Sequence, residues 1–126
     1  MASDVTAELV SALITHMRGQ TDGWESLSMV IDLRDGLLAG THGYTYGPGS
    51  VISATASRPS AVKSAVNAYT AHHLDNGQAM PLAMLVQFDR QSGRCDVTCE
   101  YHDANRWKVT PSNLYEIREL LRPAVD

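Results

Sequence analysis

The sequence predicts an α+β fold in which an antiparallel sheet of about five strands carries three helices, in the order α-β-β-β-α-β-β-α. Apolar residues recur at helical spacing in three segments, and they alternate with polar residues in the segments between them. Two turn sequences, Asp35-Gly36 and Ser92-Gly93, each join neighbouring strand-like segments. The strict alternation of strands and helices that builds a parallel sheet does not occur.

The first helix is predicted near the N-terminus, where apolar residues follow the spacing of one helical face. Ser3 or Thr6 is a suitable N-cap, and Gly19 is suited to end the helix. The predicted buried face consists of Leu9, Val10, Leu13, Ile14 and Met17.

A hairpin is predicted next. Residues Trp24 to Arg34 alternate between apolar and polar, which is typical of a half-buried strand. Asp35-Gly36 favours a tight turn, so Leu37 to Tyr46 should return antiparallel to this strand. The inward side is expected to hold Leu27, Met29, Ile31 and Leu33, and the outward side Ser26, Ser28 and Asp32.

A short third strand and a second helix follow. The β-branched segment Val51 to Thr55 predicts the strand. The helix is predicted from Pro59 to Leu74, with Ser57 as its cap and Asn76-Gly77 as its end. Its buried stripe is expected to hold Ala61, Val62, Ala65, Val66 and Tyr69.

The last third of the chain predicts a second hairpin and a final helix. Leu82 to Phe88 and Cys95 to Tyr101 alternate as two strands do. The helix is predicted to start at Thr110-Pro111, since proline suits the first helical turn, and to end at Pro123. Its inner face would hold Leu114, Ile117, Leu120 and Leu121.

The composition predicts one domain over residues 1–126, because 44% hydrophobic and 19% charged residues suffice for a single core. No apolar stretch reaches the length of a membrane span, and the N-terminus does not resemble a signal peptide, so a cytosolic location is expected. Cys95 and Cys99 are consistent with a cytosolic location, because a spacing of four strand residues places their Cα atoms about 13 Å apart, beyond disulfide reach. The net charge of −4 disfavours nucleic acids and anionic membranes as partners and favours a basic protein.

No pattern predicts a catalytic residue, a cofactor site or a metal site, so a non-enzymatic protein is expected. The glycine-rich segment Gly40 to Gly49 lacks the residue order and the lysine of a phosphate-binding loop. Cys95, Cys99 and His102 lack the fourth ligand and the close spacing of a structural zinc site. His72-His73 point about 100° apart on a helix and are poorly placed to chelate one ion. No serine or cysteine lies in a known nucleophile motif.

An acidic surface is the remaining feature. The solvent side of the strand Cys95 to Tyr101 carries carboxylates, and others lie in the first hairpin. Tyrosine and tryptophan, which anchor protein interfaces, are available nearby in sequence. Trp107 is equally suited to fill the core beneath the last helix. The predicted partner-binding residues are Asp32, Asp35, Tyr44, Tyr46, Asp96, Glu100, His102, Asp103 and Trp107.

The segment Cys99 to Leu114 combines an acidic, tyrosine-containing strand, Trp107 and a helix start at Pro111. Together with Trp24 to Leu27, which leads into the first hairpin, this pattern resembles YezG-like immunity proteins. The resemblance implies a protein that binds a cognate toxin domain in the bacterial cytosol and blocks it by occlusion. The toxin would belong to a contact-dependent growth inhibition system or another polymorphic toxin system. Such toxins are often nucleases, whose basic clefts would suit an acidic inhibitor.

Two other functions stay open. One is a small enzyme or ligand-binding domain that uses His42, the tyrosines and a cleft in the open face of the sheet. A pocket where these residues converge would favour it. The other is a secretion chaperone or adaptor, which would bind a secretion signal and is usually an obligate dimer.

Overall fold

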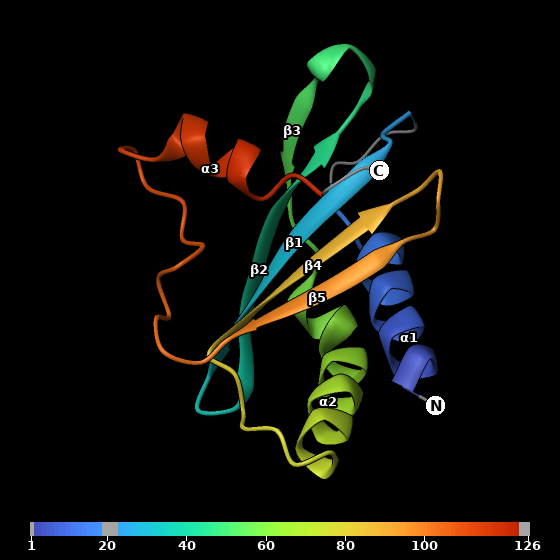
Figure 1. The fold of residues 1–126 in the computed structure, drawn as a ribbon, viewed down its shortest axis with the longest axis vertical. Helices are drawn as coiled ribbons and strands as arrows, with labels where there is room; N and C mark the ends of the chain where they lie inside the picture. Colours follow the sequence, from blue (N-terminus) through green and yellow to red (C-terminus); the bar gives the residue numbers. More distant parts are fainter. Residues whose placement is uncertain (1, 19–22, 124–126) are drawn as a thin grey trace.

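A computed structural model describes residues 2–18 and 23–123 of the chain. It has an α+β fold with one five-stranded antiparallel sheet, and its elements follow the predicted order (Figure 1). The predicted fold class is therefore confirmed. The elements are α1 (Ala2–Thr15), β1 (Ser26–Arg34), β2 (Leu37–Tyr46), the 3₁₀ turn η1 (Pro48–Ser50), β3 (Ile52–Thr55), α2 (Pro59–Asp75), β4 (Ala83–Asp89), β5 (Cys95–Glu100) and α3 (Leu114–Leu120).

The sheet is built around β1, in the strand order β3-β2-β1-β4-β5. The predicted tight turn joins β1 to β2. It places Asp35 at φ 52° and Gly36 at φ 78°, the left-handed pair that such a hairpin needs. Gly43 lets β2 approach β1, because a Cβ at this position would overlap the carbonyl oxygen of Ser28.

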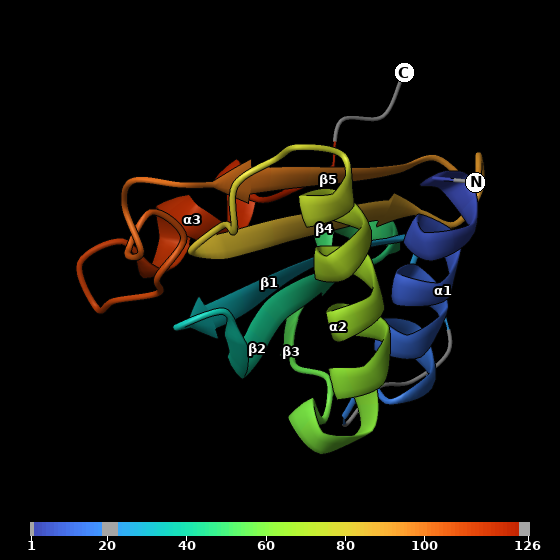
Figure 2. The same cartoon turned by 90° about the horizontal axis from the view of Figure 1, so that it is seen from below.

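β1 is buried on both sides, which corrects the prediction of a half-buried strand. Ser26 and Ser28, expected to face solvent, lie in the interior. The reason is that the sheet carries a layer on each face (Figure 2): α1 and α2 cover one face, and α3 with the loop before it covers the other. Single-strand alternation does not report this second layer.

The layer formed by α1 and α2 encloses an apolar core. The predicted stripe of α1 is confirmed for its most deeply buried members, Leu9 and Leu13. α1 begins at Ala2, so Ser3 and Thr6 lie within the helix rather than at its cap, and the predicted terminator Gly19 lies outside the described residues. The buried residues of this core are Leu9, Val10, Leu13, Trp24, Leu27, Met29, Ile31, Leu33, Val62, Val66, Met84 and Val86.

α2 ends as predicted, with Asn76 at the C-cap and Gly77 at φ 81°. It also begins at Pro59 as predicted, but Arg58 occupies the N-cap position. The predicted cap, Ser57, is buried, and its Oγ donates to the carbonyl oxygen of Leu13 at 2.7 Å. Ser57 thus joins the end of α1 to the segment before α2.

Within residues 2–18 and 23–123, no helix combines the length and the apolar content needed to cross a membrane.

α3 is shorter than predicted. It begins at Leu114 rather than at Pro111, with Asn113 at the N-cap position. Ile117 and Leu121 face the sheet as predicted and are almost fully buried. They form a second apolar cluster on the face of the sheet opposite α1 and α2.

Candidate functional site

The C-terminal arm, defined as residues 101–123, docks on the face of the sheet that α1 and α2 leave open (Figure 2). Trp107 is only 3% exposed and joins Ile117 and Leu121 in the cluster beneath the arm. Burying an apolar side chain such as Ile117 or Leu121 contributes about 1.5–3 kcal/mol, and the Trp107 side chain is larger than either. Trp107, equally suited to an interface by sequence, is therefore a core residue.

Three side chains of the sheet donate hydrogen bonds to backbone carbonyl groups of the C-terminal arm. From β2, the Tyr46 hydroxyl donates to Arg118 at 2.6 Å, and His42 Nε2 donates to Trp107 at 3.0 Å. From β4, Gln87 Nε2 donates to Leu121 at 2.9 Å. Burial raises the pKa of Tyr46 to about 12, so the phenol keeps the proton that it donates. The position of the arm thus depends on polar groups as well as on apolar burial.

His42 lies between two acceptors. While its Nε2 faces the Trp107 carbonyl oxygen, its Nδ1 is 3.5 Å from Asp32 Oδ2. Both acceptors are satisfied only when both ring nitrogens carry a proton. The hydrogen bond to Asp32 raises the pKa of His42, burial opposes this, and the Trp107 carbonyl adds to the rise. The ring is therefore suited to a structural cation rather than a general base, which needs a free nitrogen.

A cleft of about 490 Å³ opens beside this pair, between the β1–β2 hairpin and the C-terminal arm. Its charged lining is mixed, since it includes the basic residues Arg34 and Lys108 and the acidic residue Asp32. His42 lines the cleft, but Tyr44 and Tyr46 are not among the lining residues, so the cleft meets only half of the condition for the ligand-binding alternative. The lining residues are Asp32, Leu33, Arg34, Ala39, Gly40, His42, Leu82, Ala104, Asn105, Lys108 and Val109.

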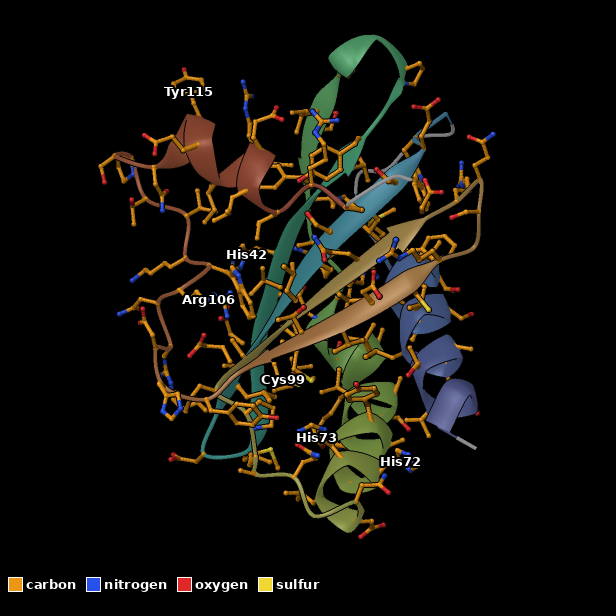
Figure 3. All side chains as sticks on the ribbon, viewed as in Figure 1. His42, His72, His73, Cys99, Arg106 and Tyr115 are labelled. Carbon is orange, nitrogen blue, oxygen red and sulfur yellow. The ribbon has the colours of Figure 1, made fainter. Side chains whose placement is uncertain are left out.

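Glu100, predicted as part of the acidic surface, holds the start of the C-terminal arm. Its Oε2 accepts the backbone N–H groups of His102 at 2.8 Å and Asp103 at 2.9 Å. Its Oε1 pairs at 2.9 Å with Arg106, which lies on the loop of the arm near His42 (Figure 3). The two backbone bonds, followed by Arg106, lower the pKa of Glu100 to about 2. This carboxylate is therefore already engaged within the chain.

The other predicted acidic positions are spread over the surface. Asp32 and Glu100 lie opposite the same residue, Ala83, so their Cα atoms are about 10 Å apart. Asp96 is four residues earlier on β5, about 13 Å from Glu100. Asp103 accepts a backbone N–H of its own loop at 2.9 Å. Asp35, Asp96, His102 and Asp103 are exposed.

Tyr44 and Tyr46, two of the predicted partner-binding residues, lie beneath the C-terminal arm. Both are buried, because the C-terminal arm covers the end of β2 on which they lie. A partner does not reach them while the arm is docked. The large polar-aromatic residues chosen from sequence are thus part of the scaffold.

A more exposed surface lies on α3, and sequence reasoning missed it. Tyr115 is 71% exposed and points away from the sheet (Figure 3), and Leu120 is 69% exposed. Leu114 is also exposed, so the assignment of Leu114 and Leu120 to the inner face was wrong. Spacing carried a signal for Leu120, because it lies about 100° around the helix from the buried Leu121. We define the α3 surface as Leu114, Tyr115, Glu116, Glu119 and Leu120.

His73 makes a contact within the fold. Its ring stacks between Tyr69 and Tyr101, and its Nε2 lies 2.8 Å from the Tyr101 hydroxyl. Cys99 lies nearby at the end of β5 (Figure 3), where burial raises the pKa of its thiol. Among the residues that the structure describes, no three His, Cys, Asp or Glu side chains are grouped as metal ligands.

No protein-family model matches the chain, and no curated protein matches it in sequence. The resemblance to YezG-like immunity proteins therefore stays a prediction from the C-terminal residues.

Proposed function

We propose that this protein is a non-enzymatic immunity protein that binds a basic toxin domain in the bacterial cytosol and blocks it by occlusion. The observation that carries the proposal is the α3 surface. Tyr115 and Leu120 are more than two-thirds exposed on one short helix. Tyrosine is enriched among the residues that anchor protein interfaces, and this seven-residue helix exposes Leu114 as well as Tyr115 and Leu120.

The charge supports a basic partner. The chain carries a net charge of −4. Glu116 lies on the α3 surface, and Asp96 is exposed on β5, whose solvent side faces the same way as α3. Complementary charge raises the association rate and selects against other acidic proteins, while the apolar centre contributes most of the affinity.

The state of His42 favours binding over catalysis. Both of its ring nitrogens are directed at acceptors within the fold. A base with no free nitrogen takes no proton from a substrate. The C-terminal resemblance to YezG-like proteins adds the class of partner, a toxin domain.

The test is growth rescue and co-purification with the toxin-like product of the neighbouring gene. Wild-type protein should rescue growth and bind one to one. The double variant Tyr115→Ala with Leu120→Ala should weaken binding at least about tenfold, because it truncates two interface anchors. Both side chains are exposed, so the variant should fold. Leu74→Ala is the matched control, since Leu74 is an exposed leucine on α2, on the other face of the sheet.

Each outcome is decisive for one part of the proposal. Neither binding nor rescue by the wild type would refute the function. Binding that is unchanged in the double variant would keep the function and remove the α3 surface. Asp96→Lys would then test whether the acidic side of β5 holds the interface.

The cleft beside His42 supports a second candidate, a small-ligand-binding domain. Its volume of about 490 Å³ is within the range of ligand pockets. Lys108→Ala would remove a basic group from its wall. A ligand that stabilises the wild type and not this variant against heat, in a protein that fails the rescue test, would favour this candidate.

A further inference from the structure

The two edges of the sheet differ in whether the outermost strand is followed by further backbone pairing. β3 is short, and residues 16–18 pair with the chain that leaves it: Met17 bridges Ser57, and Arg18 N–H donates to the Ala56 carbonyl at 2.7 Å. β5 is the outermost strand at the other edge (Figure 2). In the described part of the chain, no strand pairs with its outer side. Such an edge is a template for pairing with another strand.

The pairing of β5 with β4 shows which backbone groups point outward. Asp89 N–H donates to the Arg94 carbonyl at 2.9 Å, so Asp89 and Arg94 form a hydrogen-bonded pair. Such pairs alternate along an antiparallel ladder, which makes Asp96, Thr98 and Glu100 the residues bonded to β4. Cys95, Val97 and Cys99 therefore direct their N–H and C=O groups to the open edge.

The side chains of β5 are compatible with pairing to a second β5, with Arg94 held to Asp96 and Glu100 held to Arg106 within each copy. When two copies run antiparallel with a two-fold axis at Val97, Cys95 lies opposite Cys99 of the second copy, and both bond through their outward backbone groups. On the solvent side, Asp96 then lies opposite Thr98 of the second copy, and Arg94 lies opposite Glu100. This register places no like charges opposite one another.

Neighbouring registers are disfavoured by charge. Moving the axis to Asp96 places two copies of Asp96 directly opposite each other, at the closely spaced positions of the ladder. Moving it to Thr98 places Asp96 opposite Glu100. Charged residues on an edge strand commonly block pairing. On β5 their order instead disfavours the two registers next to the one centred on Val97.

We propose that β5 is a self-association edge, at which a second copy of this chain pairs antiparallel about Val97 and joins the two sheets into one. The two-fold axis is perpendicular to the sheet, so α1 and α2 of both copies stay on the same face. The α3 surface lies on the opposite face and stays open. The proposal is thus independent of the toxin-binding function, and either can fail alone.

The test is sedimentation of the full chain over a concentration series in reducing buffer. The mass should rise from 13.7 kDa towards twice that value. Val97→Pro should keep the protein monomeric without unfolding it, because it removes an N–H that has no bond to β4 and proline is tolerated at a strand edge. Circular dichroism checks the fold. A monomer at every soluble concentration would overturn the proposal, and so would a dimer that survives in folded Val97→Pro.

A matched pair of variants at one exposed position tests the register. Thr98→Lys places a cation opposite Asp96 of the second copy and should tighten the dimer. Thr98→Asp places a like charge there and should weaken it, with a difference of about tenfold or more between the two dissociation constants. Equal constants would overturn the register about Val97.

Oxidation gives a second measure of the register. Diamide takes two hydrogens from a pair of thiols and leaves a disulfide, and opposed residues about 5.5 Å apart at Cα are within disulfide reach. Wild-type protein should give a covalent dimer through Cys95 and Cys99 of opposite copies. Cys95→Ser and Cys99→Ser should each abolish it. A covalent dimer that persists in either single variant would show a different pairing and overturn the register.

Discussion

The layers on the two faces of the sheet are held in place by different interactions. The face covered by α1 and α2 is closed by aliphatic side chains on a regular spacing, such as Leu13 and Val66. The face covered by the C-terminal arm also has an apolar cluster, but Tyr46, Gln87 and His42 tie the arm down through its backbone carbonyls. The first layer depends on burial, which is non-directional. The second depends on donors placed within about 3 Å of particular carbonyls, and one of them titrates.

This difference predicts which part of the molecule can loosen while the rest stays folded. Loss of one side chain from the α1 and α2 layer should lower the stability of the whole domain, because both helices and the sheet share that core. Loss of one donor beneath the arm should loosen the arm while the sheet remains intact. The arm carries the α3 surface, so its docking sets the geometry of the proposed interface.

The largest effect is expected from Leu13→Ala in the α1 and α2 layer. Leu13 has no exposed surface, and its removal leaves a cavity between α1 and the sheet. The free energy of unfolding should fall by about 3 kcal/mol in a urea titration. The control is Leu37→Ala, since Leu37 is 62% exposed and should change stability by less than about 0.5 kcal/mol. Equal effects of the two substitutions would contradict the core assigned to this face.

Tyr46→Phe should have a smaller and more local effect. It removes the hydroxyl that donates to the Arg118 carbonyl and that also contacts the Ser28 hydroxyl. Both groups therefore lose this hydrogen bond. The expected cost is about 1–2 kcal/mol. Amide hydrogen exchange should accelerate in α3 more than in α1 or α2. Uniform acceleration across all helices would show that the arm does not open separately from the rest of the domain.

His42 should make the docking of the arm depend on pH. Its folded-state pKa lies above the unfolded value of 6.5, so the stabilisation by the charged ring is fully present below pH 6.5. It is lost as the pH rises through the folded-state pKa. The stability difference between the wild type and His42→Gln should therefore shrink with increasing pH. Asp32→Asn should lower the pKa of His42 in an NMR titration, and an unchanged pKa would contradict the ion pair.

The smallest effect concerns the first turn of the arm. The carboxyl of Glu100 should titrate near pH 2 in a carbon-detected NMR experiment, because the backbone N–H groups of His102 and Asp103 bind its charged form. Arg106→Gln should raise this pKa only in part, since the two backbone bonds remain. The stabilisation by Glu100 is present above its unfolded value of 4.5 and is lost as the pH falls towards 2. A titration midpoint near 4.5 would contradict the role assigned to Glu100.

The candidate site was less predictable than the fold. Asp35, Asp96, His102 and Asp103 are exposed as expected, but exposure alone does not identify an interface. Tyr44, Tyr46 and Trp107 were chosen for residue type, which does not separate an interface anchor from a core residue. The exposure of Tyr115 depends on which side of a seven-residue helix meets the sheet. Two helical turns are too short for periodicity to define that side.

The order and type of the elements, both hairpin turns and the apolar face of α1 followed from the amino-acid sequence alone. These features are local, because turn residues and apolar spacing act within a few positions along the chain. The folded structure was needed to show that β1 is buried on both sides, that Ser57 bonds to Leu13 and that His42 contacts Asp32 and Trp107. These contacts join residues far apart in the sequence, often through backbone carbonyls. Every residue carries such a carbonyl, so the sequence does not mark the one that receives the bond.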